Sequence, residues 1–246
     1  SIQNFGSMDV LCTDKTGTLS ENRISLIEYL DPEGKSNDKV LSYAFLNSYF
    51  HSGIQNPLDE AVISHHHQEP GEFRKIDEIP FDFVRRRMSI AVCRGSERLL
   101  ISKGAPEEIL RICSFIEQNG TRTAITDQDR EKVSLLYRSK STDGFRTLAV
   151  CYRDLEHDQR LFSLDDERDM TLIGLVTFID PPKETAPESI RQLAESGIEL
   201  KILTGDNELV TRKISSLIGL DVKAVLTGTE IEKLDRQTLS RVVEDV

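Results

Sequence analysis

The chain has 246 residues, of which 38% are hydrophobic and 30% are charged, and its formal net charge at pH 7 is -11. This length suits one large domain or two of ordinary size. No apolar run approaches the roughly 18 residues of a membrane span, and the N-terminus lacks the pattern of a signal peptide. The acidic charge argues against nucleic-acid binding, because contacts to phosphate need a surplus of lysine and arginine.

The first expected element is a buried strand in MDVLCTD (8–14), which ends at Asp14. A carboxylate at the carboxyl end of a strand lies where open α/β sheets bind ligands. Because carboxylates are ionised at neutral pH, Asp14 is a candidate nucleophile for a phosphoryl group. Gly17 permits close approach of the backbone, and Asp14 with the Thr16 carbonyl offers two oxygen ligands to Mg²⁺. A strand-to-helix turn capped by Asp14 is the simpler alternative.

The middle of the chain has a different pattern. We expect helices over 37–50 and 57–67, and two more over 105–113 and 127–140. Short runs rich in β-branched and aromatic residues, joined in part by tight turns, predict hairpins and an antiparallel sheet. These runs are RKIDEIPFDF (74–83), RRMSIAVCR (86–94), RLLISK (98–103), FRTLAVCYRDL (145–155) and DMTLIGLVTFI (169–179).

Residues 180–220 again show alternating helices and strands. A helix is expected over Thr185–Ser196, a strand over 198–203 and a second helix over Asn207–Ile218. Strands and helices that alternate in this way predict a parallel sheet with crossover helices. The strand is followed by TGD (204–206), whose hydroxyl and amide groups suit a phosphate oxygen at the positive end of the next helix. A helix-capping turn explains this tripeptide equally well.

These patterns predict an α/β domain in two parts, 1–28 and 180–246, with an α+β domain (29–179) inserted between them. Pro181 and Pro182 would stiffen the second crossing. Cys12, Cys93, Cys113 and Cys151 each lie among apolar residues, so we expect reduced core cysteines with no disulfide partner. The triplet HHH (65–67) is expected at a surface or helix end, because neighbouring helical side chains point about 100° apart and would not converge on a metal.

The string DKTGTL (14–19) resembles the phosphorylation signature of P-type ATPases, the ion pumps of the haloacid dehalogenase superfamily. KGAPE (103–107), DPPK (180–183) and TGD (204–206) follow in the order of that family. The resemblance implies a Rossmann-like haloacid dehalogenase phosphorylation domain, discontinuous and truncated at its C-terminal end, with an inserted α+β nucleotide-binding domain. It also implies that Asp14 is phosphorylated, with Lys15, Thr16 and Thr18 beside it, and that Thr204, Gly205 and Asp206 hold phosphate and help to place Mg²⁺.

The same resemblance implies an ATP site in the inserted domain. Phe81 matches the aromatic residue that stacks on adenine, with Phe83 as the rival, although both could be ordinary core residues of a strand. Other positions match residues that contact adenine (Asp59), line the pocket (Lys103, with Gly104 allowing close approach to the base) or reach the phosphates (Arg86 and Arg146). Lys183 replaces the arginine usual in DPPR, which keeps the charge but loses bidentate geometry.

The implied function is that of an ATP-driven cation pump that uses ATP and Mg²⁺. SIQNFGSMDVLCTDKTGTL, PFDFVRRRMS and FIDPPK are most similar to the bacterial magnesium-transporting branch. The implied partners are the actuator domain and transmembrane helices of the same pump, at the cytoplasmic face of the inner membrane. The motif GDGxND is missing, so we expect a fragment with little or no activity of its own.

Two alternatives remain at this point. The first is a haloacid dehalogenase-type phosphotransferase or phosphatase, and the second is a nucleotide-binding regulatory module without catalysis. Many phosphatases of the superfamily carry a general acid two residues after the nucleophile, where this chain has Thr16. Since a threonine hydroxyl cannot serve as an acid or base near neutral pH, an aspartyl phosphate should persist, which favours a pump.

Overall fold

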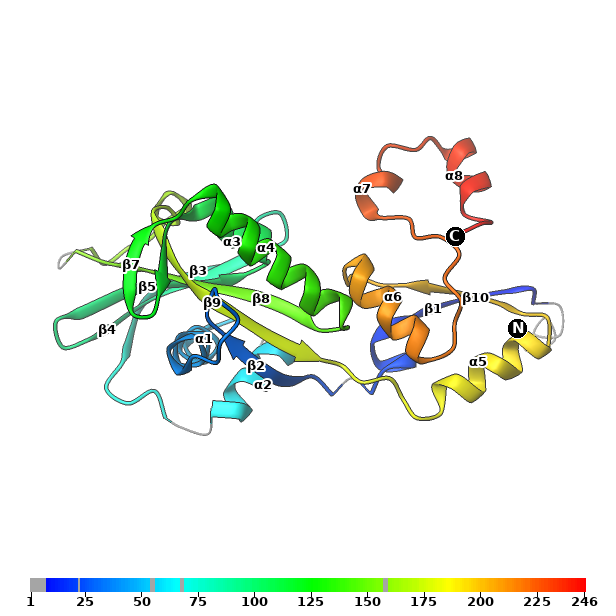
Figure 1. Cartoon of the computed structure of the whole chain (residues 1–246), viewed down its shortest axis with the longest axis horizontal. Helices are drawn as coiled ribbons and strands as arrows, with labels where there is room; N and C mark the ends of the chain where they lie inside the picture. The colour runs from blue at the N-terminus through cyan, green and yellow to red at the C-terminus, as the bar shows by residue number, and fades with distance from the viewer. Residues whose placement is uncertain (1–7, 22, 54–55, 67–68, 157–158) are drawn as a thin grey trace. The chain divides into compact units, whose positions relative to one another are not determined.

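The computed structural model describes residues 8–21, 23–53, 56–66, 69–156 and 159–246 (Figure 1). The chain divides into two compact units. Unit 1 comprises Ser1–Arg23, Ser141–Gly144 and Asp180–Val246, and unit 2 comprises Ile24–Lys140 and Phe145–Ile179. Residues 24–28, which we expected in the first domain, group with unit 2 because β2 (Ser25–Leu30) pairs antiparallel with β9 (Met170–Ile179).

Unit 2 is built on one eight-stranded sheet. Its strand order is β3-β4-β5-β8-β9-β6-β7, and β2 also pairs with β9. All pairings are antiparallel except that of β6 with β9, so the expected antiparallel sheet contains one parallel pair. The remaining strands are β3 (Arg74–Asp82), β4 (Arg87–Arg94), β5 (Glu97–Gly104), β6 (Cys113–Gln118), β7 (Thr121–Ala124) and β8 (Arg146–Asp154).

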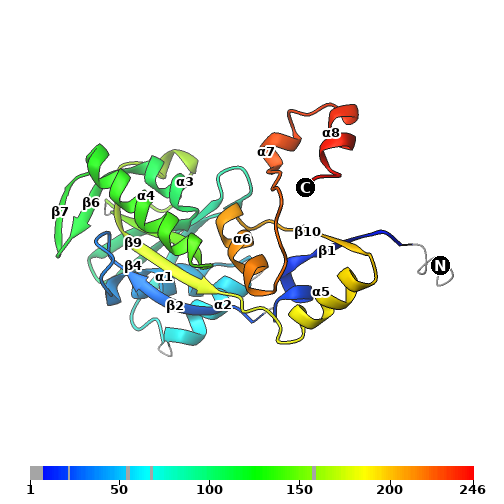
Figure 2. The same ribbon diagram turned by 45° about the vertical axis from the view of Figure 1, so that its right-hand side comes forward.

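Helices cover both faces of this sheet (Figures 1 and 2). Strand side chains alternate between the faces, so Ile90 and Ile101 pack in one core and Ala91 and Leu100 in the other. The first core is closed by α1 (Asp38–Phe50) and α2 (Pro57–His66), and the second by α3 (Pro106–Ile112) and α4 (Asp127–Thr142). A short 3₁₀ helix, η3 (Leu164–Asp166), precedes β9.

Unit 1 contains a pair of parallel strands, β1 (Val10–Asp14) and β10 (Glu199–Leu203), which lie side by side in Figure 2. A tight turn, η2 (Lys15–Leu19), follows β1. The helices are α5 (Ala186–Glu195), α6 (Glu208–Leu217), α7 (Gly228–Ile231) and α8 (Arg236–Val242). The bounds of α5, β10 and α6 each agree with the sequence prediction to within one residue at either end.

The cysteine prediction is only partly right. Cys113 and Cys151 are buried, whereas Cys93 is half-buried and Cys12 is exposed. Cys12 shares one face of β1 with Val10 and Asp14, and all three are exposed because no packed layer covers that face in the described part of the chain. No helix of the described residues is long and apolar enough to cross a membrane.

Candidate functional site

The strand register of unit 2 brings several predicted site residues to one end of the sheet. Arg87 at the start of β4 pairs with Gly104 at the end of β5, and Gly104 pairs with Ala149 of β8. The end of β3 joins them, because Asp82 pairs with Arg87. Phe81, Arg86, Lys103 and Gly104 therefore lie at this end, and Arg146 begins β8 three residues before Ala149.

The centre of this site is a buried ion pair. Lys103 Nζ lies 2.5 Å from Asp59 Oδ1, and the two side chains are 2% and 0% exposed. Lys103 also donates to the Ser48 hydroxyl on α1. Burial lowers the pKa of the Lys103 ammonium, and the nearby Asp59 carboxylate opposes that shift without cancelling it. The pair thus links β5 to both helices of this face.

One atom of the pair is unsatisfied. Asp59 Oδ2 is buried and has no hydrogen-bond partner. A buried carboxylate oxygen in this state costs free energy unless a donor reaches it, because it has lost its contacts with water. A ligand with an N–H group directed at Asp59 would supply that donor.

Gly104 is required by the close approach of β4. A Cβ atom at this position would lie 2.4 Å from Arg87 Cβ and 2.5 Å from the Arg86 carbonyl oxygen. That same carbonyl accepts a hydrogen bond of 2.9 Å from the Ala105 amide. The observed reason for a glycine at this position is thus the backbone of Arg86–Arg87, since a larger residue does not fit there, and the predicted approach of a nucleotide base to Gly104 stays a prediction.

The two candidate aromatic residues are exposed, which excludes the alternative that they are core residues. Phe81 is 45% exposed and Phe83 is 88% exposed, and their rings meet edge to face with centroids 5.3 Å apart. Arg86 has a left-handed backbone with φ of 48°, and its guanidinium donates to Glu108 Oε1 at 3.1 Å. Desolvation is the largest single influence on the pKa of Glu108 and raises it, but hydrogen bonds and charge from Arg86 and Arg111 together outweigh it and hold this pKa below its ordinary value.

A buried carboxylate that the sequence analysis missed lies beside these residues. Glu167, whose side chain has no exposed surface, accepts hydrogen bonds of 2.7 Å from Arg85, Arg87 and Ser89. Its partners lie about 80 residues away in the sequence, so no local spacing could have revealed the contact. The RRR run (85–87) was the available signal, because clustered cations at a buried strand end need a counter-charge.

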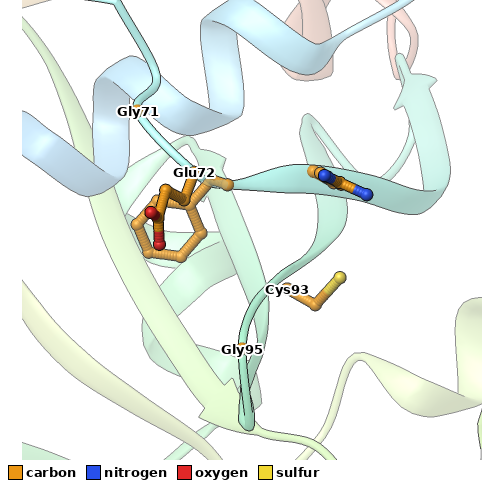
Figure 3. A pocket seen from close by; sticks show the side chains of 6 residues that line it. Gly71, Glu72, Cys93 and Gly95 are labelled. Atoms are coloured by element: carbon orange, nitrogen blue, oxygen red, sulfur yellow. The ribbon is translucent and has the colours of Figure 1, made fainter.

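A surface depression of about 610 Å³ lies at the opposite end of β3 and β4 (Figure 3). It is lined by residues before and at the start of β3, by one residue near the end of β4 and by the turn after it, namely Gly71, Glu72, Phe73, Arg74, Cys93 and Gly95. Cys93 is six residues along β4 from Arg87, which corresponds to about 20 Å. The depression is therefore separate from the Asp59–Lys103 site.

In unit 1 the predicted phosphate residues lie together at the carboxyl end of the β1–β10 pair. Because β1 and β10 are parallel and Asp14 pairs with Leu203, Asp14, the last residue of β1, and Thr204, the first residue after β10, lie at the carboxyl ends of neighbouring strands. The Asp14 side chain is exposed and accepts a long hydrogen bond of 3.4 Å from the Thr16 amide. Thr204 Oγ1 accepts from the Asp206 amide at 3.1 Å, and a Cβ at Gly205 would meet no atom within 4 Å. This end of the strand pair is therefore accessible to a ligand.

Lys15 and Asp206 form a buried ion pair beside this end of the β1–β10 pair. Lys15 Nζ lies 2.6 Å from Asp206 Oδ2 and 3.6 Å from Asp180 Oδ2, and all three side chains are 2% exposed or less. Asp180, which the sequence analysis did not single out as a site residue, also accepts a 2.5 Å hydrogen bond from Ser20. Lys15 thus joins the ends of three segments of unit 1.

Lys183, expected among the ATP-binding residues, donates to the Gly17 carbonyl at 2.8 Å and so holds the turn after Asp14. Within the described ranges, no group of three or more His, Cys, Asp or Glu side chains is arranged to hold a metal ion. Of the triplet HHH, His65 contacts the Tyr29 ring edge to face and His66 stacks on Phe45, whereas His67 lies outside the described residues.

The sequence profile of the family described as P-type ATPase, cytoplasmic domain N, matches residues 31–185. Because this match covers more than half of the chain, the chain belongs to the P-type ATPase family, as the motifs predicted.

Individual relatives refine this assignment. The chain is 41% identical over 250 residues to a magnesium-transporting ATPase, P-type 1, of Escherichia coli K12, which covers 99% of the chain and 28% of that protein. It is 42% identical over 246 residues to the protein of the same name from Salmonella typhimurium strain 14028s, with 98% and 27% covered. A calcium-transporting ATPase of Listeria monocytogenes is 28% identical over 273 residues, with 100% and 31% covered. The chain therefore spans less than a third of the length of these relatives.

Proposed function

We propose that this chain is the ATP-binding part of a magnesium-transporting P-type ATPase and that it carries the aspartate phosphorylated in the transport cycle. The observation that supports ATP binding most directly is the buried Asp59–Lys103 pair with its unsatisfied carboxylate oxygen. The identity of 41–42% to two magnesium-transporting ATPases supports the choice of ion.

The residues at this end of the unit 2 sheet suit the parts of ATP. The Asp59 Oδ2 atom can accept the exocyclic amino group of adenine, which would satisfy it. Phe81 offers an exposed ring on which the base can stack, an interaction worth about 1–3 kcal/mol. Arg86, Arg146 and Lys103 bring positive charge to the same end of the sheet, as binding of a polyphosphate requires.

In unit 1 we assign the phosphoryl acceptor to Asp14. Its carboxylate is exposed at the carboxyl end of β1, and Thr204 and Gly205 at the end of β10 can donate to phosphate oxygens. The Asp14 carboxylate and the Thr16 carbonyl are the two oxygen ligands that we propose for Mg²⁺, whose charge offsets that of the transferred phosphoryl group.

Asp206, which we expected at the phosphate, and Lys183, which we expected among the ATP-binding residues, have structural partners in unit 1. Asp206 is held by Lys15, and Lys183 is held by the Gly17 carbonyl. We propose that both orient the Asp14 turn, while Thr16, which cannot act as a general acid, leaves the acyl phosphate intact. The surroundings that complete the cycle would be the actuator domain and the membrane helices of the same pump, at the cytoplasmic face of the membrane.

The test is calorimetric titration of the 246-residue chain with ATP. Lys103→Ala and Phe81→Ala should each weaken binding, and Lys132→Ala is the control for loss of a lysine, because Lys132 is exposed on α4. Binding that is unchanged in both Lys103→Ala and Phe81→Ala would show that ATP binds elsewhere or that another residue set forms the pocket.

A further inference from the structure

We propose that Glu167 is a positioning residue for the nucleotide site: through Arg85 it fixes the place of Phe81, the ring on which adenine stacks. The inference rests on the proposed function, because it takes ATP as the ligand. It concerns a carboxylate on the segment before β9 that touches none of the residues expected to contact the nucleotide base.

Glu167 holds the start of β4 with both carboxylate oxygens. Oε2 accepts from Arg85 Nη1 and Arg87 Nε at 2.7 Å each, and Oε1 accepts from the Ser89 hydroxyl at 2.7 Å. The side chains of Arg85 and Arg87 are only 16% and 12% exposed. Two guanidinium groups are therefore concentrated on one buried carboxylate, which makes short, charge-assisted hydrogen bonds.

Arg85 connects Glu167 to the backbone next to Phe81. Its Nη1 atom binds Glu167, and its Nη2 atom donates to the carbonyl of Pro80 at 2.7 Å. Pro80 immediately precedes Phe81, and its ring limits the backbone there to a narrow range of φ. The planar guanidinium thus fixes the distance from Glu167 to the backbone of Pro80, the residue next to Phe81.

The turn between β3 and β4 is closed by further hydrogen bonds. The Asp82 carboxylate accepts from the amides of Val84 and Arg85 at 2.9 and 2.8 Å, and the Asp82 carbonyl accepts from the Arg86 amide at 2.7 Å. Arg86 is left-handed, a conformation that persists only when its surroundings hold it. Glu167 supplies this support from a different segment of the chain.

A purely structural role is a poor explanation for such a residue. Burying a charged carboxylate costs desolvation, and an apolar side chain of similar volume is often as stable or more stable. Glu167 instead converts three neighbouring polar side chains into one rigid support. Rigid support of a binding group raises affinity, because less conformational entropy is lost when the ligand binds.

The experiment measures ATP affinity and the stability of unit 2 for Glu167→Gln and Arg85→Lys. Glu167→Gln removes the charge, and Arg85→Lys keeps the charge but cannot bridge Glu167 and Pro80. We expect each variant to bind ATP about tenfold more weakly, within the roughly 5- to 150-fold that loss of one base–aromatic stack represents. Affinity equal to that of the wild-type chain in both variants would overturn the proposal.

A matched control is Glu117→Gln. Glu117 is also a largely buried carboxylate held by a cation, Lys39, and by a hydroxyl, that of Tyr152. It lies on β6, four strands from β4, which is about 19 Å. Glu117→Gln should lower stability without changing ATP affinity, so a loss of affinity in this variant too would show that any weakening of the domain suffices.

A double-mutant cycle identifies the route of the effect. If Glu167 acts through Phe81, then Glu167→Gln should weaken ATP binding about tenfold in the wild-type chain and less than about twofold when Phe81 is already alanine. Equal losses in both backgrounds would show that Glu167 affects ATP binding by a route other than Phe81 and would overturn the proposal.

A measurement without ligand separates this inference from the proposed function. In Glu167→Gln, the amide of Arg86 should exchange its hydrogen about tenfold faster, because the turn that protects it has lost its support. Unchanged exchange contradicts the positioning role. If the wild-type chain fails to bind ATP, the proposed function is wrong, and the exchange result still decides whether Glu167 holds the turn.

Discussion

Replacing Lys103 with methionine should separate the stability of unit 2 from its affinity for ATP. Methionine removes the charge while filling much of the same volume. The Asp59 side chain, which has no exposed surface, would then be a buried carboxylate with neither a counter-charge at Oδ1 nor a partner at Oδ2. Breaking a buried ion pair in this way costs about 3–5 kcal/mol of unfolding free energy.

The double variant Asp59→Leu/Lys103→Met should behave differently. It removes both charges, and apolar replacement of a buried pair is often neutral or stabilising by about 1–4 kcal/mol. The double variant should therefore recover most of the stability lost in Lys103→Met. It should nevertheless fail to bind ATP, because the proposed acceptor for adenine and the adjacent cation are both gone.

The assay is urea unfolding followed by tyrosine fluorescence, with ATP titration of the same samples. The chain has no tryptophan, and its five tyrosines all lie in unit 2, so this signal reports that unit alone. If the double variant is as unstable as Lys103→Met, the pair contributes net stability and our reasoning about its role is wrong. If the double variant binds ATP like the wild-type chain, the pair is not part of the ATP site.

Three further predictions follow from other residues. Gly104→Ala should destabilise unit 2 by about 1–3 kcal/mol in a urea titration, because its Cβ would overlap β4, and an unchanged urea midpoint would contradict this close packing. The Arg85 amide lowers the pKa of Asp82 below its ordinary 3.8, so this carboxylate should stabilise the fold above about pH 4 and lose that effect as the pH falls through its folded value. The gap in urea midpoint between the wild-type chain and Asp82→Asn should accordingly close from pH 5 to pH 3, and a constant gap would contradict it. In the full-length pump, Asp14→Asn should abolish the acid-stable, hydroxylamine-sensitive phosphoenzyme formed from labelled ATP, and labelling that persists would exclude Asp14.

Local patterns predicted α5, β10 and α6 of unit 1 well, whereas α7 and α8 were not predicted. The apolar positions of α5 and α6 recur at helical spacing, and Gly197 stops the first helix with a φ of 75°. The strand β10 contains the charged residues Glu199 and Lys201, but Gly197 before it and the turn at 204–206 after it delimit it clearly. Each of these signals lies within a few residues of the element that it specifies, so local sequence is enough to predict that element.

The partners of charged side chains could not be predicted in the same way. Glu167 meets Arg85 and Arg87, and Lys15 meets Asp180, across 80 to 165 residues of chain. Such contacts depend on the sheet register and on the path of loops, which periodicity does not report. The sequence therefore indicated which strand ends carry chemistry, and only the structure shows which side chains hold those ends in place.

Burial was predicted well only where two layers meet. Cys113 and Cys151 lie under α3 and α4 and are buried, whereas the equally apolar surroundings of Cys12 belong to a strand with one exposed face. An apolar run in the sequence does not reveal how many packed layers cover it. For the same reason Phe81 and Phe83, which alternate with polar residues, could be core or ligand-binding until their exposure was known.

The most direct test of the central claim is to titrate the ¹⁵N-labelled chain with ATP and follow its amide signals. The proposed function predicts that the largest shifts fall on Phe81, Arg86, Lys103 and Gly104, with small changes at the depression near Gly71 and Gly95. Shifts concentrated around Gly71–Arg74 and Gly95, with Lys103 and Phe81 unmoved, would show that the nucleotide binds at the other end of the β3–β4 hairpin and would contradict the account.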